Sequence, residues 1–225
     1  LTTARRTIDI YDGEIKYTDY LISQIVKTIK EERIDKDSII ILTADHGEQL
    51  GQHGMYGHAG LHEANTLIPF IAWGPGQNIP QGKKLKGYAQ HTDIVPTVLD
   101  LITAEKRPEM AGESLLRAMN GKEPLREEIF MEGYLMRGII RRSWKYIWHL
   151  DGREELYNME KDPMEVINLV DKEKEVRKEL RCSLERWVYK NLHHREDPIV
   201  KAERIIRKAK EENSYTSDIT KLPWG

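Results

Sequence analysis

The chain has 225 residues, a formal net charge of −2 and a single cysteine, Cys182. The near-neutral charge excludes a general attraction to nucleic acid, and the lone cysteine excludes an internal disulfide. No apolar run approaches the roughly 20 residues that a membrane-spanning helix needs. We expect a soluble protein of one or two domains, with the cytoplasm favoured among compartments that the composition leaves open. Because the first residue is Leu1 rather than Met, we also expect the chain to begin inside a longer protein or after processing.

The N-terminal half alternates helices and strands. Apolar side chains recur at three- and four-residue steps over residues 8–32, which predicts an amphipathic helix. The unbroken apolar run at residues 39–43 predicts a strand buried on both faces, as in a parallel sheet. The later elements are expected to be a short helix at 61–67, strands at 69–73 and 86–90, and a helix capped by Thr92 or Asp93 with Pro96 in its first turn. This order predicts an α/β fold, with a mostly parallel sheet flanked by helices.

The character of the sequence changes near residue 107. Four strand-like pieces at residues 127–134, 136–142, 144–149 and 154–157 are joined by short polar links, which predicts an antiparallel meander. A helix at residues 171–192, with Trp187 on its buried face, and a second helix from Pro198 to about residue 212 should follow. We therefore divide the chain into an α/β part, residues 1–122, and a small C-terminal antiparallel sheet and helix subdomain, residues 123–225. Residues 214–225 are expected to be a loose or docked tail.

The end of the first predicted strand carries the residues most suited to chemistry. Asp45 and His46 stand where the strand gives way to a loop rich in glycine and histidine, residues 47–60, which we call the glycine loop. Ligands in open α/β sheets bind at the carboxyl ends of strands. A carboxylate and an imidazole at such an end suit one divalent cation, Zn²⁺, Mn²⁺ or Mg²⁺, and suit Ca²⁺ less well. A bare Asp-His pair would more often be structural, but the glycine loop and its histidines favour a metal site.

The remaining histidines are ranked by position. His58, in the glycine loop, is suited to holding or protonating an ester oxygen near neutral pH. His53 and His62 are weaker candidates, since loop histidines often cap or pack. His91 lies at another strand-to-helix turn and is a weak candidate for substrate binding or for supporting the site. Three others are expected to be surface or packing residues, namely His149, His193 and His194.

In family order along the chain, several stretches resemble the C-terminal half of an arylsulfatase-like sulfatase, in the alkaline phosphatase superfamily. The matching stretches are Tyr11-Asp12-Gly13-Glu14-Ile15, Thr43-Ala44-Asp45-His46-Gly47-Glu48, Ile68-Pro69-Phe70-Ile71, His91-Thr92-Asp93-Ile94-Val95-Pro96-Thr97, Arg142-Ser143-Trp144-Lys145-Tyr146 and Glu155-Leu156-Tyr157-Asn158. The resemblance implies that Asp45 and His46 are metal ligands, for Ca²⁺, Mn²⁺ or Zn²⁺. It places His58 where sulfatases carry a substrate-binding Lys, and His46 where many carry Asn.

The resemblance also implies parts that this sequence lacks. Sulfatases use a formylglycine nucleophile made from a Cys/Ser-x-Pro-x-Arg motif, and Cys182 is not followed by the Pro of that motif. That motif and the first metal ligands belong to the family's N-terminal half. We therefore expect no nucleophile in this chain, and little activity from the chain alone.

The resemblance predicts part of a metal-dependent sulfuric ester hydrolase that acts on a sulfate ester. The first alternative is a phosphodiesterase or phosphonate monoester hydrolase of the same superfamily, acting on a phosphate or phosphonate ester. The second is a non-catalytic binding or assembly domain. Strand edges left bare would favour self-association.

Overall fold

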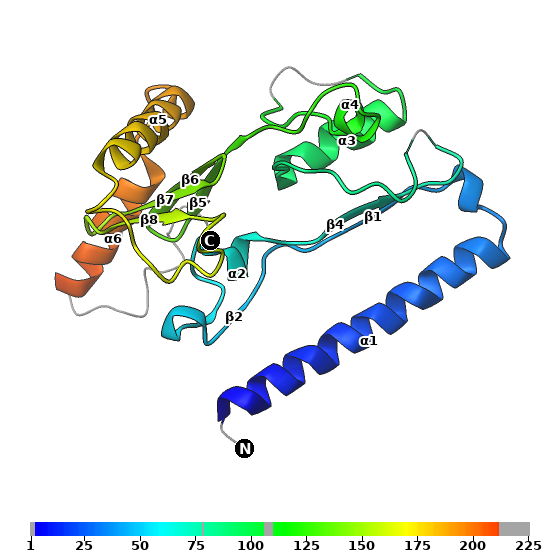
Figure 1. Cartoon of the computed structure of the whole chain (residues 1–225), viewed down its shortest axis with the longest axis horizontal. Helices are drawn as coiled ribbons and strands as arrows, with labels where there is room; N and C mark the ends of the chain where they lie inside the picture. Colours follow the sequence, from blue (N-terminus) through cyan, green and yellow to red (C-terminus); the bar gives the residue numbers. More distant parts are fainter. Residues whose placement is uncertain (1–2, 78, 106–109, 212–225) are drawn as a thin grey trace. The chain divides into compact units, whose positions relative to one another are not determined.

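A computed structural model describes residues 3–77, 79–105 and 110–211 (Figure 1). The chain forms two compact units. Unit 1 contains Leu1–His58 and Ala64–Glu127, and unit 2 contains Ala59–Glu63 and Glu128–Gly225. The predicted domain division at residue 122 stays a prediction, and the expected tail at 214–225 lies outside the described residues. No helix in the described part of the chain is long and apolar enough to cross a bilayer.

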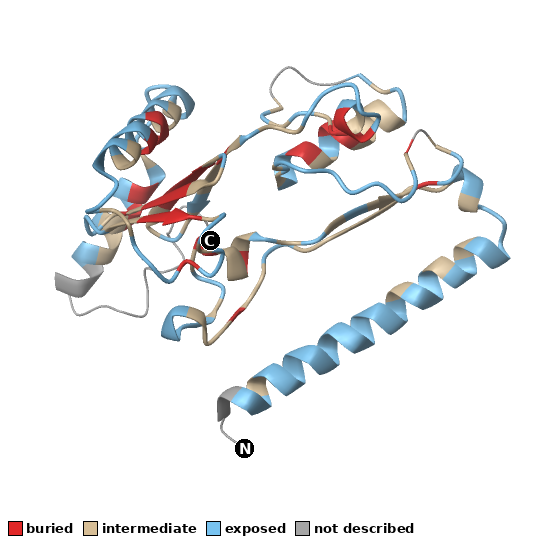
Figure 2. Cartoon of the chain, in the orientation of Figure 1, coloured by how far each residue is buried: buried red, intermediate tan, exposed pale blue. Residues whose placement is uncertain are grey.

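Unit 1 begins with helix α1, Thr3–Glu31, which confirms the predicted N-terminal helix. Its apolar residues recur at helical spacing, but many remain in contact with solvent. Ile10, Ile15 and Ile25 are 57%, 54% and 59% exposed, and Figure 2 shows most of α1 as exposed. Apolar surface of this extent on one helix usually marks a packing face, because burying it is favourable.

The central strands of unit 1 correct one expectation. Strand β1, Ile40–Thr43, pairs with β4, Phe70–Trp73, in antiparallel register, with Leu42 opposite Ile71. All strand pairs among the described residues are antiparallel, so the predicted mostly parallel sheet is not found. Residues 44–69 bring the chain back to the end at which β1 stops, and β4 therefore runs in the opposite direction. The residues of β1 are half-buried rather than enclosed on both faces.

Short elements fill the rest of unit 1. The glycine loop contains a two-residue hairpin formed by β2, Gln49–Leu50, and β3, Tyr56–Gly57, with a 3-10 turn at Gln52–Gly54 between them. The predicted short helix is α2, Glu63–Thr66, which begins in unit 2 and ends in unit 1. The expected strand at 86–90 is reduced to a single bridge between Tyr88 and Arg126.

A turn and two helices complete unit 1. The 3-10 turn His91–Asp93 leads directly into α3, Ile94–Leu101, which has Pro96 in its first turn as predicted. The short helix α4, Leu116–Met119, follows.

Unit 2 contains the predicted antiparallel meander. Its four strands pair in chain order, β5 with β6, β6 with β7 and β7 with β8. Their bounds are Glu128–Gly133 for β5, Met136–Arg141 for β6, Trp144–His149 for β7 and Glu154–Asn158 for β8. Both faces of this sheet carry buried side chains, because successive strand residues point to opposite faces. Ile139, Tyr146 and Leu156 form one cluster, and Ile147 and Tyr157 form another with Leu61. Figure 2 shows the buried residues of unit 2 concentrated in these strands.

Helix α5, Lys174–Leu192, covers the meander, and α6, Pro198–Glu211, follows it. Leu180 and Leu184 of α5 pack with Ile139, Tyr146 and Leu156 of the sheet. Trp187 is half-buried rather than largely buried, and it stacks on Phe130 with ring centroids 4.9 Å apart. The apolar face of α5 therefore packs where the sequence placed it.

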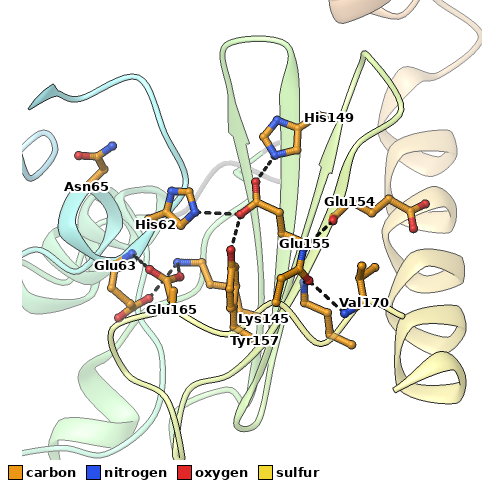
Figure 3. Close-up of polar contacts among 12 residues, drawn as sticks. His62, Glu63, Asn65, Lys145, His149, Glu154, Glu155, Tyr157, Glu165 and Val170 are labelled. Carbon is orange, nitrogen blue, oxygen red and sulfur yellow. Dashed lines mark hydrogen bonds and ion pairs between the residues drawn. The ribbon is translucent and has the colours of Figure 1, made fainter. Parts of the chain in front are cut away.

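The half-buried carboxylate of Glu155 organises a polar cluster in unit 2 (Figure 3). Glu155 accepts hydrogen bonds from His62 Nε2 at 2.9 Å, His149 Nε2 at 2.6 Å and the Tyr157 hydroxyl at 2.7 Å. Burial raises the pKa of Glu155, but the bonds from His149, His62 and Tyr157 outweigh it and hold the net pKa well below the usual range. Glu155 is therefore anionic at neutral pH, and each imidazole donates through Nε2.

Replacing Glu155 by Gln should lower the free energy of unfolding by about 2–3 kcal/mol at pH 7, because an amide nitrogen would face groups that must donate. Since the folded pKa lies below the unfolded value of about 4.3, the carboxylate stabilises the fold above that pH. Its contribution is lost as the pH falls through the folded pKa. Urea unfolding at pH 7 and at pH 3 checks this. If the difference in free energy of unfolding between the wild type and Glu155→Gln is larger at pH 3 than at pH 7, the assignment is contradicted.

Candidate metal centre

The backbone at the end of β1 is fixed by a close approach. Gly47 donates its N–H to the carbonyl of Asn65 at 2.8 Å. A Cβ at position 47 would lie 2.0 Å from the carbonyl oxygen of Ala64, so no other residue fits without a backbone shift. This contact fixes the path of the chain immediately after Asp45 and His46.

Three side chains of unit 1 converge beside this point. His46, Glu48 and His58 each offer a ligand atom, and these atoms lie within 4.8 Å of one another. The rings of His46 and His58 stack with centroids 4.1 Å apart, and His58 Nδ1 lies 3.0 Å from Glu48 Oε2. Two imidazoles and a carboxylate form a donor set typical of Zn²⁺ or Mn²⁺ sites.

Hydrogen bonding orients the His46 ring for coordination. Its Nδ1 lies 2.9 Å from the carbonyl oxygen of Gly47, and because a carbonyl can only accept, Nδ1 carries a proton. Nε2 is left as the nitrogen that can coordinate, the usual arrangement for a metal-bound histidine. It lies 3.6 Å from Asp45 Oδ2. Two ligand atoms about 2.1 Å from one tetrahedral ion lie roughly 3.4 Å apart, so this spacing is suitable for a shared ion.

Asp45 is exposed and anionic. Its Oδ1 accepts the backbone N–H of His46 at 2.9 Å, and this bond, followed by the charge of His46, lowers the pKa of the carboxyl. Its side chain is 86% exposed, and it lies outside the group formed by His46, Glu48 and His58. An exposed, charged carboxylate next to His46 is suited to bind a cation from solvent.

The structure separates the histidines that the sequence ranked. His46 and His58 lie together, whereas His53 is exposed in the 3-10 turn with φ 54°. His91 donates to the carbonyl of Ala44, one residue before Asp45. His62 belongs to unit 2 and bonds Glu155, as does His149, which fits the packing role expected of it.

Sequence reasoning missed one member of the group, Glu48. The available signal was the His-x-Glu spacing, because residues two apart on an extended segment point to the same side.

His193 and His194 are exposed, as expected.

Cys182 is exposed on α5 rather than packed against the sheet. Arg186 stands four residues after it, as in the motif, but Leu184 occupies the position of the required Pro.

Comparisons with known proteins show which family this chain resembles. Residues 2–104 match the Sulfatase family model. A sulfatase of Formosa agariphila is 31% identical over 166 residues, which cover 73% of this chain and 32% of that protein. The chain spans about a third of the length of the curated relatives it matches.

Two solved structures share the fold. One, a complex with its substrate D-glucosamine-2-N,6-O-disulfate, has a TM-score of 0.73 at 24% identity, covering 81% of this chain and 41% of that chain. A phosphonate monoester hydrolase of Agrobacterium radiobacter has a TM-score of 0.72 at 24% identity, covering 82% and 41%. Both support a sulfatase-like α/β fold. From the family match and the curated relatives, we conclude that residues 2–104 belong to the sulfatase family.

Proposed function

We propose that this chain supplies part of the active site of a metal-dependent sulfuric ester hydrolase. The observation that carries the proposal is the convergence of His46, Glu48 and His58 beside the exposed carboxylate of Asp45. Nitrogen and oxygen donors at the end of a strand, on a loop whose path is fixed at Gly47, suit a divalent cation. The match to the sulfatase family indicates that the substrate is a sulfate ester.

In this proposal Asp45 and His46 hold the metal ion, as the resemblance implies, and Glu48 adds a third donor. The two-imidazole, two-carboxylate environment favours Zn²⁺ or Mn²⁺ over Ca²⁺, which prefers six or more oxygen ligands. When bound, the ion would neutralise charge on the ester oxygens.

His58 is the catalytic residue of the proposal. The Glu48 carboxylate accepts the Nδ1 hydrogen at 3.0 Å, and this fixes the ring and leaves Nε2 free to face an ester oxygen. A histidine held in this way can bind the ester or pass a proton to its leaving oxygen. His91, the first residue of the 3-10 turn and itself in contact with the Ala44 carbonyl, stays a weaker candidate for substrate contact.

The nucleophile and the remaining ligands would come from a segment that these 225 residues do not include, in which we expect the formylglycine motif. The apolar side chains exposed on α1 support such a missing packing partner. A second copy of the chain, joined through α1 or through bare strand edges, is the alternative partner.

The 225-residue chain alone should therefore hydrolyse neither aryl sulfates nor aryl phosphates above background. Catalysis needs a nucleophile held in line with the ester, and hydroxyls without an adjacent base are poor nucleophiles. Release of nitrophenol from both esters, with Zn²⁺ or Mn²⁺ added, measures this. Robust turnover that Asp45→Ala abolishes would show that the chain contains a nucleophile.

The second candidate is phosphonate monoester or phosphodiester hydrolysis. The specific observation in its favour is His58, which stands where the family resemblance implies a Lys, together with the fold shared with the Agrobacterium enzyme. An imidazole provides a weaker and pH-dependent positive charge for a sulfate group.

Chelation tests the proposed function. The product of the complete gene, assayed with an aryl sulfate, should lose activity after dialysis against EDTA and recover it when one divalent ion is restored. Activity that survives metal removal would overturn the metal-dependent proposal.

A further inference from the structure

His91 makes a long-range contact with the end of β1. Its Nε2 lies 2.8 Å from the carbonyl oxygen of Ala44, a residue 47 positions earlier in the chain. Because a carbonyl oxygen can only accept, His91 Nε2 carries the hydrogen. Thr43 Oγ1 lies 3.5 Å from the same oxygen, at the outer limit of a hydrogen bond. The imidazole of His91 is therefore the main side chain that holds this carbonyl.

The turn that carries His91 is rigidly built around Asp93. The Asp93 side chain is fully buried and accepts the Gln90 N–H at 2.7 Å, the Glu113 N–H at 2.9 Å and Arg126 Nη2 at 2.6 Å. The Gln90 side chain accepts from the Asp93 backbone in return, which closes a capping box around His91.

Further backbone contacts hold the same turn. Thr97 Oγ1 donates to the Asp93 carbonyl at 2.6 Å and accepts the Leu115 N–H at 2.9 Å. Gly112 lies so close that a Cβ there would come within 1.8 Å of the Thr92 carbonyl oxygen. A turn fixed on several sides can hold a neighbouring segment in place.

The segment that His91 reaches lacks such support of its own. Asp45 and His46 are both exposed, and the backbone hydrogen bond closest after them is the Gly47 N–H to Asn65. The Ala44 carbonyl belongs to the peptide that joins Ala44 to Asp45, so its orientation fixes the direction from which the Asp45 side chain leaves the strand. Holding this carbonyl on one side and Gly47 on the other defines where the Asp45 carboxylate and the His46 ring lie.

We propose that His91 is a positioning residue of the metal centre, which holds the Ala44–Asp45 peptide through its Nε2–H and so orients Asp45 and His46 toward the ion. This inference rests on the proposed metal centre. His91 does not itself bind the ion. Partners of this kind typically change metal affinity by about 10- to 100-fold when they are removed.

Three variants of the 225-residue chain separate this role from a general structural one. His91→Ala removes the donor, His91→Gln places an amide N–H2 at a reach close to that of Nε2, and His91→Asn carries the same amide but is one methylene too short. Each is measured for Zn²⁺ affinity by calorimetric titration, and for hydrogen exchange at the His46 and Gly47 amides without metal. Thermal unfolding records overall stability.

We expect His91→Ala and His91→Asn to weaken Zn²⁺ binding by about 10-fold or more and to speed exchange at both amides, with His91→Gln close to wild type. Unchanged affinity and exchange in His91→Ala would overturn the inference, as would a His91→Asn variant that matches His91→Gln. If the 225-residue chain binds Zn²⁺ too weakly to measure, the same variants are titrated in the product of the complete gene, which includes the remaining ligands, and a wild-type product that binds no Zn²⁺ would overturn the proposed metal centre. The exchange measurements still decide whether His91 holds the end of β1.

Discussion

Replacing Lys145 by Met is expected to lower the free energy of unfolding of unit 2 by about 3–5 kcal/mol. The Lys145 side chain is completely buried, and its Nζ lies 2.8 Å from Glu165 Oε1 and 3.1 Å from Glu63 Oε1 (Figure 3). Glu165 is also buried, and its Oε2 accepts the Glu63 N–H at 2.7 Å. Removing the ammonium would leave two carboxylates facing each other without a cation.

Urea unfolding followed by tryptophan fluorescence measures this effect. Lys161→Met, at an exposed lysine, is the matched control and should change stability by less than about 0.5 kcal/mol. Combining Lys145→Met with Glu63→Gln and Glu165→Gln should recover much of the loss, because no charge then remains buried alone. A loss below about 1 kcal/mol for Lys145→Met would show that the cluster is not closed as described.

The second large effect concerns Asp45 and His46 in the product of the complete gene. We expect Asp45→Ala and His46→Ala each to reduce aryl sulfate turnover by about 10³-fold or more, because a ligand of the ion that stabilises the developing charge is lost. Steady-state kinetics on each variant, at saturating divalent ion, measures the loss in kcat. The effect should fall on kcat rather than on KM alone.

Two further variants serve as controls for this prediction. His53→Ala, in the same loop but outside the converging group, should stay within about threefold of wild type. His46→Asn should lose far less than His46→Ala, because the family resemblance implies that Asn serves at this position in many sulfatases. Equal losses from His46→Asn and His46→Ala, or a large loss from His53→Ala, would argue against the assigned ligands.

Local patterns predicted the elements well. The 3.6-residue spacing of apolar residues marked α1, and strand-like pieces joined by short polar links marked β5 to β8. The apolar run at residues 39–43 located β1 but not its partner, because the composition of a strand records burial and not the direction of its neighbour. Strand direction depends on where the connecting chain returns, which no local pattern records.

The candidate site was predicted only in part, because local patterns do not record which distant residues meet in the folded chain. Asp45, His46 and His58 were identified from their place after a strand and within a glycine-rich loop. Glu48 was missed because a glutamate in a polar loop is usually solvated. The bond from His91 to Ala44 and the bond from His62 to Glu155 join residues 47 and 93 positions apart, and their pairing depends on the folded chain.

The measurement that tests the central claim most directly is a comparison of ester classes with the metal-loaded product of the complete gene. Aryl sulfate, aryl phosphonate monoester and aryl phosphodiester would be assayed side by side for kcat/KM, with Asp45→Ala as the blank. Our account predicts the highest kcat/KM for the sulfate ester and background rates for all three in the variant. A phosphonate or phosphodiester hydrolysed more efficiently than the sulfate, or sulfate turnover that survives Asp45→Ala, would contradict it.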